Sequence, residues 1–451
     1  MASSRAQRKI GVFSHGGLKN LGDEALFAAV IQNVRLRVPD AQIVGFTANP
    51  EDTELRHEIP AFPIARLEKP RKSDPPSTKA LAKPASDTTR TARRSSWKQF
   101  LKAVPGVTAI VHGIRTTLRV TRDILLEPKF LWQSYKRLRG VELLLVAGSQ
   151  QLNDIYGAWA FPISLYKWSV LSRVAGTKMA LLSVGAGPIS SSFSQFLIRC
   201  VLRMCSYRSY RDTISSELVT RIGSKGVHPV FPDLAYSMRL PEPRSVPTDK
   251  NVVVVGVNPV PFYDGRYWAT PNPARYLDYI DKFARFGRWL DQNGYSTLLF
   301  PTQARADVLT IQDIRAAMNR DGNSTRMLEG LPIQSIGDLV TEIARADLVI
   351  ANRYHGILLS LALNKPVLGV AYHEKSRALL EQVGQGDYVL NIADFSFEEL
   401  VEKFKALHAH AAQSKKEIAA RIAPLRVQLE RQFDTVFGLI GIEPPLRPER
   451  N

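Results

Sequence analysis

An arginine and a histidine stand two residues apart at the end of a short apolar segment in the C-terminal third of the chain. Residues 346–356 read ADLVIANRYHG, so Arg353 and His355 directly follow a predicted buried strand. Open α/β sheets bind ligands at the carboxyl ends of their strands. The apolar run at 357–363 predicts a helix, and the amides at its N-terminus favour anions. This pattern indicates a site for an acidic substrate. The plainer interpretation is an arginine paired with a surface carboxylate and a histidine that packs inside the fold.

A second polar loop follows the first predicted strand, at residues 14–25. It contains Asn20, Gly22 and Asp23 and leads directly into a predicted helix. Glycine lets the backbone approach a ligand, and first-turn amides can hold an anion. The glycine spacing matches neither the dinucleotide motif nor the phosphate-loop motif, so no nucleotide cofactor is expected. An acidic residue at this position can also simply complement the helix dipole, and that interpretation stays open.

Small residues also follow two later strands. Gly148 and Ser149 come after one of them, and residues 185–188 read GAGP after the next. Small residues at three successive strand ends predict backbone that lines a cleft, although tight packing of helix against strand would select them too. The chain has only two cysteines and no zinc or calcium signature, so we expect no metal.

The order of apolar segments predicts two domains of the same kind. Strand-like segments alternate with helix-like ones at 10–14, 41–46, 141–147, 178–184 and 207–211, and again at 251–257, 296–300, 348–351 and 367–370. Such alternation is typical of parallel sheets with helices on both faces. The predicted fold class is therefore α/β, with two doubly wound (Rossmann-like) domains that face a cleft. We place these domains at 1–240 and 241–396, and we expect the helical tail at 397–451, interrupted at Pro424, to pack across their junction.

The net charge of +18 is concentrated in one insert. Residues 66–139 contain 18 Lys or Arg and only 5 Asp or Glu. Residues 69–96 are rich in Pro, Ser and Thr and are expected to be disordered. Residues 97–125 show apolar side chains at helical spacing beside basic ones, which predicts an amphipathic hairpin of helices. Such an element can cover the first domain, lie on an anionic membrane or bind nucleic acid. No nucleic-acid module surrounds it, so nucleic acid is not an expected partner.

Membrane-spanning segments are not expected from the sequence. No apolar stretch reaches the roughly 18 to 20 residues that a spanning helix needs. The N-terminus is basic but has no apolar signal-peptide core. We therefore expect a cytoplasmic protein, with peripheral contact at the inner face of the membrane through the basic insert as a further option.

Taken together, these segments resemble the polysaccharide pyruvyl transferase family over most of the chain outside the insert. The resemblance rests on residues 20–25 (NLGDEA), Gly148 followed by Asp154, residues 185–188 (GAGP), residues 210–212 (YRD) with Ser215, residues 232–233 (PD), residues 352–356 (NRYHG), residues 365–366 (KP), and Tyr372 with Lys375. The chain departs from the family pattern at two positions. Residues 147–149 read AGS where a run of glycines is expected, and Asn352 stands where a serine is often found.

The resemblance implies an enzyme that moves the pyruvyl group of phosphoenolpyruvate onto a sugar of a cell-surface polysaccharide, or of its lipid-linked precursor. The reaction would form a pyruvate ketal and release phosphate. The family's architecture is similar to that of GT-B glycosyltransferases, which implies an acceptor side in the first domain and a donor side in the second. Arg353 and His355 map to donor-binding and catalytic positions, and Arg211 maps to a second arginine that holds the donor.

The predicted site follows from this chemistry. Guanidinium groups bind carboxylate and phosphate oxygens in pairs, so Arg353 and Arg211 are expected to hold the donor, with Lys375 as a further charge. His355, poised near neutral pH, is the expected acid, and Asp23 is the expected base for the acceptor hydroxyl. The remaining predicted substrate contacts are Asn20, Gly22, Gly148, Ser149, Asn352 and Gly356.

Two other functions stay open from the sequence alone. A GT-B glycosyltransferase that uses a nucleotide sugar would need a carboxylate for the ribose, and Glu374 is the nearest candidate. A scaffold that binds polyanions or membranes without catalysis would have no use for an imidazole beside Arg353.

Overall fold

The computed structural model describes residues 7–15, 20–66, 126–240, 252–268, 270–303, 306–319 and 326–445. The segment predicted to be disordered at 69–96 and the amphipathic hairpin predicted at 97–125 lie outside these residues. The chain forms two compact units, one made of residues 1–64 and 140–451 and the other of residues 65–139. In the described part of the second unit, residues 126–138 are helical. Both predicted sheets lie in the first unit.

The first sheet has six parallel strands in the order β3-β2-β1-β4-β5-β6. Its strands are β1 (Lys9–Ser14), β2 (Gln42–Thr47), β3 (Ala61–Pro63), β4 (Val141–Ala147), β5 (Lys178–Val184) and β6 (Tyr207–Tyr210). The helices that follow these strands are α1 (Leu21–Arg37), α2 (Pro50–His57), α5 (Phe161–Ala175), α6 (Ser192–Met204) and α7 (Thr213–Arg221). Central strands such as β4, with the sequence VELLLVA, are apolar throughout because helices cover both faces of a parallel sheet. The winding reverses between β1 and β4, which creates a switch point at the carboxyl edge.

The second sheet repeats this arrangement in the order β12-β11-β10-β7-β8-β9. Its strands are β7 (Val254–Asn258), β8 (Ser296–Leu299), β9 (Met327–Leu328), β10 (Leu348–Ala351), β11 (Val367–Ala371) and β12 (Val389–Asn391). Its helices are α8 (Pro273–Gln292), α9 (Ala306–Met318), α10 (Ile336–Ala344), α11 (Tyr354–Ala362), α12 (Glu374–Gln382) and α13 (Phe397–Ala409). Here the winding reverses between β7 and β10. Two parallel sheets with alternating helices confirm the predicted α/β class with two doubly wound, Rossmann-like domains.

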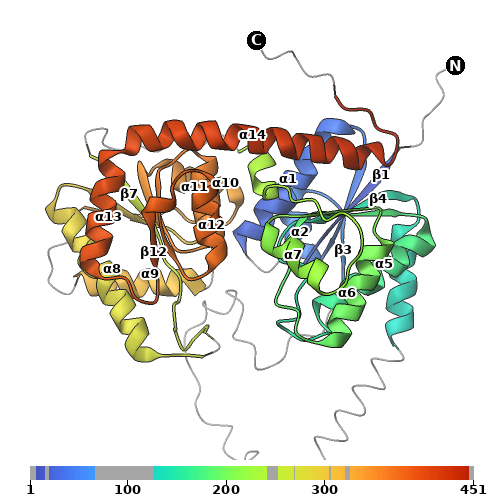
Figure 1. Ribbon diagram of the computed structural model, residues 1–451, viewed down its shortest axis with the longest axis horizontal. Coiled ribbons are helices and arrows are strands. Elements are labelled where there is room, and N and C mark those ends of the chain that lie inside the picture. The colour runs from blue at the N-terminus through green and yellow to red at the C-terminus, as the bar shows by residue number, and fades with distance from the viewer. Residues whose placement is uncertain are drawn as a thin grey trace, which may run out of the picture. The chain divides into compact units, whose positions relative to one another are not determined.

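The last helix, α14 (Ala411–Gly438), contacts both sheet-containing halves of this unit (Figure 1). Arg426 donates a hydrogen bond of 3.2 Å to the carbonyl of Ala362 in the second half. Asp434 pairs with Arg37 of α1 at 2.7 Å in the first half. The break predicted at Pro424 is absent, since α14 continues through this residue. The two C-terminal helices separate at residue 410 instead. Pro424 is exposed, so the hydrogen bond that its ring removes lies on the solvent side of the helix.

An apolar cluster joins the two halves between α1, α11, α14 and the short helix η2 (Leu234–Ser237). Leu26, Leu234, Leu358 and Leu429 belong to this cluster, one from each element, and all are almost completely buried. The two carboxyl edges are thereby held within one compact unit. The domain boundary predicted after residue 240 falls at 241–251, outside the described residues. Among the described helices, none combines the length and the apolar character needed to cross a membrane.

Candidate active site

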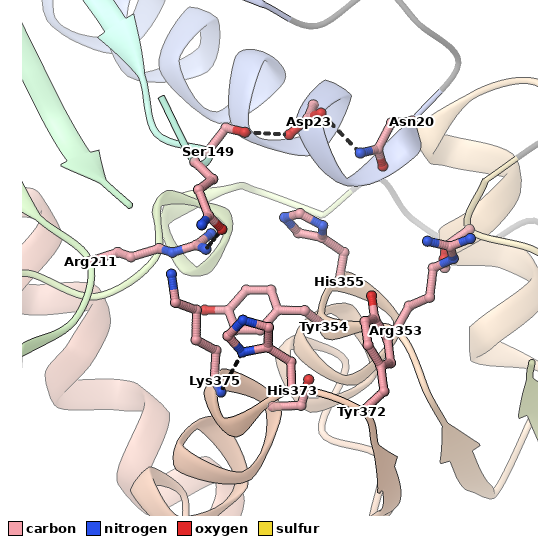
Figure 2. A pocket seen from close by; sticks show the side chains of 13 residues that line it. Asn20, Asp23, Ser149, Arg211, Arg353, Tyr354, His355, Tyr372, His373 and Lys375 are labelled. Atoms are coloured by element: carbon pink, nitrogen blue, oxygen red, sulfur yellow. Dashed lines mark hydrogen bonds between the residues drawn. The ribbon is translucent and has the colours of Figure 1, made fainter. Parts of the chain in front are cut away.

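A cavity of about 250 Å³ lies where the carboxyl edges of the two sheets meet. The first half lines it with residues that follow β1, β4 and β6, and the second half with residues that follow β8, β10 and β11. Seven of the residues predicted from the sequence line it: Asn20, Asp23, Ser149, Arg211, Arg353, His355 and Lys375. Figure 2 shows these side chains around one shared space. Because ligands bind at such strand ends, this cavity is the candidate active site.

Asp23 is held in place by two hydrogen bonds at the N-terminus of α1. The amide nitrogen Nδ2 of Asn20 donates to Oδ2 of Asp23 at 2.9 Å, and the hydroxyl of Ser149 donates to Oδ1 at 2.8 Å. Asn20 also caps the helix, because its Oδ1 accepts a hydrogen bond of 3.1 Å from the amide of Gly22. The carboxylate is thus fixed in orientation at the wall of the cavity (Figure 2).

The imidazole of His355, in the first turn of α11, packs against Gly22 of the opposite half. A Cβ atom at Gly22 would lie 2.1 Å from Nδ1 of His355, so only glycine leaves room for the ring. Nε2 of His355 is buried and has no hydrogen-bond partner among the described residues. Burial lowers the pKa of His355 below its ordinary value, against the opposing charges of Asp233 and Asp23. Burial thus favours the neutral ring in the protein without a ligand, which differs from the imidazole poised near neutral pH that was expected from the sequence.

Arg353 is anchored by a buried carboxylate that was not expected from the sequence. Its Nε lies 2.9 and 3.0 Å from the two carboxylate oxygens of Asp307, and its Nη2 lies 2.5 Å from Oδ1. Asp307 is fully buried at the start of α9 and also accepts hydrogen bonds from the amides of Thr302 and Gln303. Burial opposes the charge of Arg353, but Asp307 outweighs this effect and raises the pKa of the guanidinium. Nη1 makes no hydrogen bond to a described residue, so this edge of the guanidinium is open to a ligand.

Replacing Asp307 by asparagine is expected to lower the free energy of unfolding by about 3 kcal/mol, because it removes the charge partner from a largely buried ion pair. Unfolding in denaturant measures this change. Asp313→Asn is the matched control: Asp313 pairs with Arg266 near the surface, where an ion pair contributes only about 0–1 kcal/mol. Equal losses for the two variants would show that the Asp307 pair has no special role in stability.

Arg211 is a buried cation that makes no close hydrogen bond to any residue the structure describes. Its side chain is 6% exposed, and Nη1 lies 3.7 Å from Asp233 while Nε lies 3.5 Å from Asp212. Nη2 lies 3.5 Å from the amide oxygen of Gln150. All three distances exceed the roughly 2.7–3.2 Å of a good hydrogen bond. The guanidinium carbon sits 5.0 Å from the centre of the Tyr354 ring, a cation–π contact that holds it at the cavity. Its N–H groups are therefore largely unused.

Lys375 brings a second under-bonded cation to the same part of the cavity (Figure 2). Its Nζ has no hydrogen-bond partner in the described part of the chain, and Asp212 lies 3.9 Å away. Burial, and then the neighbouring charge of Arg211, lower the pKa of Lys375 to about 8. Two buried cations lie side by side here, and the charge of Arg211 lowers the pKa of Lys375, so the site favours an anionic ligand. In the described ranges no group of three or more His, Cys, Asp or Glu is placed to hold a metal ion.

Comparison of the sequence with models of protein families shows which family the chain belongs to. The family model described as polysaccharide pyruvyl transferase matches residues 20–374. The chain belongs to the polysaccharide pyruvyl transferase family. This confirms the resemblance seen in the sequence and makes the protein an enzyme of that class. The match includes every residue that lines the cavity except Lys375 and Ser376. A comparison with curated protein sequences gave no match.

Solved structures share the architecture of this pyruvyl transferase. A putative UDP-N-acetylglucosamine 2-epimerase from Listeria monocytogenes has a TM-score of 0.56 at 12% identity, covering 97% of this chain and 100% of its own. A UDP-GlcNAc 2-epimerase from Neisseria meningitidis, bound to UDP-GlcNAc, has a TM-score of 0.50 at 11% identity, covering 96% and 100%. HepE from Anabaena, in complex with UDP, has a TM-score of 0.50 at 13% identity, covering 96% and 97%. At such identities the likeness shows the fold alone, which is of the predicted GT-B type.

Four residues predicted as substrate contacts of the pyruvyl transferase do not line the cavity: Gly22, Gly148, Asn352 and Gly356. Gly148 has a φ of +43°, and a Cβ there would lie 3.3 Å from Leu234. A Cβ at Gly356 would lie 2.2 Å from the side-chain oxygen of Asn258. Asn352 is completely buried. The two glycines, like Gly22 under His355, let the loops pack closely. A direct contact of any of these four residues with a substrate stays a prediction.

Six further lining residues were not among the predicted site residues: Gln150, Thr302, Tyr354, Tyr372, His373 and Ser376. Their positions beside predicted residues were a usable signal, since Gln150 follows Ser149 and Tyr354 lies between Arg353 and His355. Thr302 and the anchoring Asp307 had no such signal. They lie after an ordinary apolar strand, and Asp307 looks like any acidic residue in the first turn of a helix.

Proposed function

We propose that this enzyme transfers the pyruvyl group of phosphoenolpyruvate to a saccharide, forming a pyruvate ketal and releasing phosphate. The observation that supports this most strongly is the pair of buried cations, Arg211 and Lys375, whose N–H groups make no close hydrogen bond within the described part of the chain. Arg353 adds a third cation, and Asp23 is the only acidic residue among the described residues that line the cavity. Such a surplus of charge and of unused donors favours a small ligand with two acidic groups.

Phosphoenolpyruvate carries a phosphate and a carboxylate on a three-carbon frame. In the proposed complex, Arg211 and Lys375 bind the phosphate, because their free donors face the same part of the cavity. Arg353 presents Nη1 to the carboxylate while Asp307 keeps its guanidinium in place. The first-turn amides of α11 add to the field that favours an anion.

The proposed reaction begins with a proton transfer to the methylene carbon of the donor. His355 supplies this proton, since the negative charge of a bound donor raises the pKa of an adjacent imidazole. A sugar hydroxyl forms a bond to the central carbon as its own proton passes to Asp23. A second hydroxyl of the same sugar then displaces phosphate from that carbon and closes the ketal, and its proton leaves with the phosphate.

The acceptor in this proposal enters from the first half, where Asp23 is oriented by Asn20 and Ser149. It is a sugar of a cell-surface polysaccharide or of a lipid-linked precursor. A lipid-linked acceptor would place the enzyme in the cytoplasm at the inner face of the membrane, where the basic insert at 66–139 would meet anionic lipid.

Affinity for phosphoenolpyruvate is expected to fall as the pH rises through about 8, the pKa to which burial and Arg211 lower Lys375. Below this pH the ammonium group is charged and attracts the donor, and above it the charge is lost. Calorimetric titration of the donor at a series of pH values measures this dependence. The Lys375→Arg variant keeps its positive charge over this pH range, so its affinity for phosphoenolpyruvate should not fall near pH 8. A parent protein whose affinity is constant from pH 7 to above pH 9 would refute this role of Lys375.

Titration with phosphoenolpyruvate and with UDP-N-acetylglucosamine separates the proposed function from a nucleotide-sugar glycosyltransferase. Structural neighbours bound to UDP and UDP-GlcNAc motivate the comparison. Glu374, the carboxylate considered for a ribose, does not line the cavity. We expect the protein to bind phosphoenolpyruvate and to release phosphate when a suitable saccharide from a panel is added. Binding of the nucleotide sugar without binding of phosphoenolpyruvate would overturn the proposal.

A further inference from the structure

An exposed apolar patch lies on the first half of the main unit, outside the lining of the cavity. It consists of Ile155, Tyr156 and Trp159 between β4 and α5, together with Phe193 and Phe196 in the first turns of α6; we call these five residues the aromatic patch. Their exposed fractions lie between 44% and 79%. The rings of Trp159 and Phe193 are neighbours, with centroids 5.9 Å apart. Clusters of large exposed apolar side chains mark interaction surfaces.

Asp154 fixes the two segments that carry the aromatic patch. Its carboxylate accepts hydrogen bonds from the backbone amides of Ser190, at 2.9 and 3.0 Å, and of Ser191, at 2.8 Å. Its own amide donates to the carbonyl of Pro188 at 2.9 Å. These hydrogen bonds hold the backbone of the two segments in place. Less conformational entropy is therefore lost when the aromatic patch binds a partner.

The helices beside the aromatic patch carry basic residues and no carboxylate. Residues 155–206 contain five Lys or Arg and no Asp or Glu, although 42 of the 451 residues of the chain are acidic. Helices α5 and α6, which flank the patch, contact each other. Arg203 follows Phe196 by seven residues and is exposed on the same side of α6, whereas Arg199 donates a hydrogen bond of 2.8 Å to the carbonyl of Ile222. This charge pattern complements an anionic surface.

We propose that the aromatic patch inserts into the interfacial region of an anionic phospholipid bilayer. Trp and Tyr settle at the headgroup level, Ile and Phe reach the acyl boundary, and basic residues attract anionic headgroups. Three of the five side chains, those of Ile155, Phe193 and Phe196, are wholly apolar, which favours a lipid over a saccharide as the ligand. The loop that carries the patch starts at the cavity with Ser149 and Gln150, so insertion places the active site beside the membrane. This inference rests on the proposed function in one respect, the membrane-side acceptor.

Cosedimentation of the full chain with vesicles of phosphatidylcholine, with and without phosphatidylglycerol, tests the proposal. Salt of about 0.5 M screens the purely electrostatic attraction of the basic insert, so binding that persists reports insertion. Trp159→Ser combined with Phe193→Ser is expected to weaken binding to the anionic vesicles about tenfold or more. Leu55→Ser combined with Val227→Ser is the matched control, because these side chains are 82% and 81% exposed outside the patch. The control should bind as the parent does.

Unchanged vesicle binding by the Trp159 and Phe193 variant would overturn the proposal, as would failure of the parent protein to bind anionic vesicles. Loss of turnover on a soluble saccharide with vesicle binding intact would show that the patch binds saccharide instead. Loss of a dimer in light scattering with vesicle binding intact would show that it joins two copies of the chain. Affinity for phosphoenolpyruvate, measured on the same samples, should not change, so a failure of the donor chemistry is distinguished from a failure of membrane docking.

Discussion

His355→Ala is expected to lower kcat for phosphate release by about 10³-fold, because a general acid contributes roughly 10²–10⁴-fold to a proton transfer. Affinity for phosphoenolpyruvate should change little, since the cations that hold the donor remain. The rate is measured at saturating donor with a saccharide that the parent protein turns over. Folding should be retained, because Nε2 of His355 has no partner within the described ranges whose hydrogen bond would be lost.

His373→Asn is the matched control for the histidine substitution. His373 also lines the cavity, but it caps α12 by accepting a hydrogen bond of 3.2 Å from the amide of Lys375. Asparagine is a good capping residue, so this variant should keep turnover within about tenfold of the parent. Full turnover by His355→Ala, or an equal loss in both variants, would contradict the role of His355 as the acid.

Arg211→Met is expected to raise the dissociation constant of phosphoenolpyruvate by about 10²–10⁴-fold. Two charge-assisted hydrogen bonds to the phosphate, at about 1.5–3 kcal/mol each, account for a loss of this size. Methionine keeps much of the apolar stem and removes the charge. Calorimetric titration of the donor measures the change directly, without the need for an acceptor.

Arg208→Met, three positions earlier and on β6, is the control for Arg211. Its guanidinium donates to the carbonyl of Leu202 at 2.7 Å and does not line the cavity. We expect donor affinity in this variant to stay within about threefold of the parent. Unchanged affinity in Arg211→Met would remove the main support for the proposed donor site.

Much of the cavity could be predicted from the sequence because strand ends are easy to locate. Apolar runs such as VELLLVA in β4 and LVIA in β10 mark buried parallel strands, and the polar residue that follows each of them must lie at a carboxyl edge. Ser149 and Arg353 were found in this way. The carboxyl edges of the two sheets face each other, and this brings Asp23 and Arg353 to the same cavity.

The parts that could not be predicted depend on side-chain packing between distant segments. The pairing of Arg353 with Asp307 joins residues 46 positions apart, and nothing in the first turn of α9 distinguishes that carboxylate from an ordinary helix-dipole residue. Gly22 was expected to approach the ligand, whereas it makes room for the His355 ring. The lowered pKa of His355 follows from burial, which the local sequence does not encode. The amphipathic hairpin at 97–125 stays a prediction.

In the proposed site, the cavity binds both acidic groups of one donor molecule. Isothermal titration of the purified chain tests this binding directly, with phosphoenolpyruvate, pyruvate and inorganic phosphate as ligands. We predict one phosphoenolpyruvate per chain, and affinities at least about tenfold weaker for pyruvate and for phosphate, because each of these offers only one of the two groups that Arg353, Arg211 and Lys375 bind. Equal affinity for phosphate and phosphoenolpyruvate, or no binding of phosphoenolpyruvate, would contradict the proposed site.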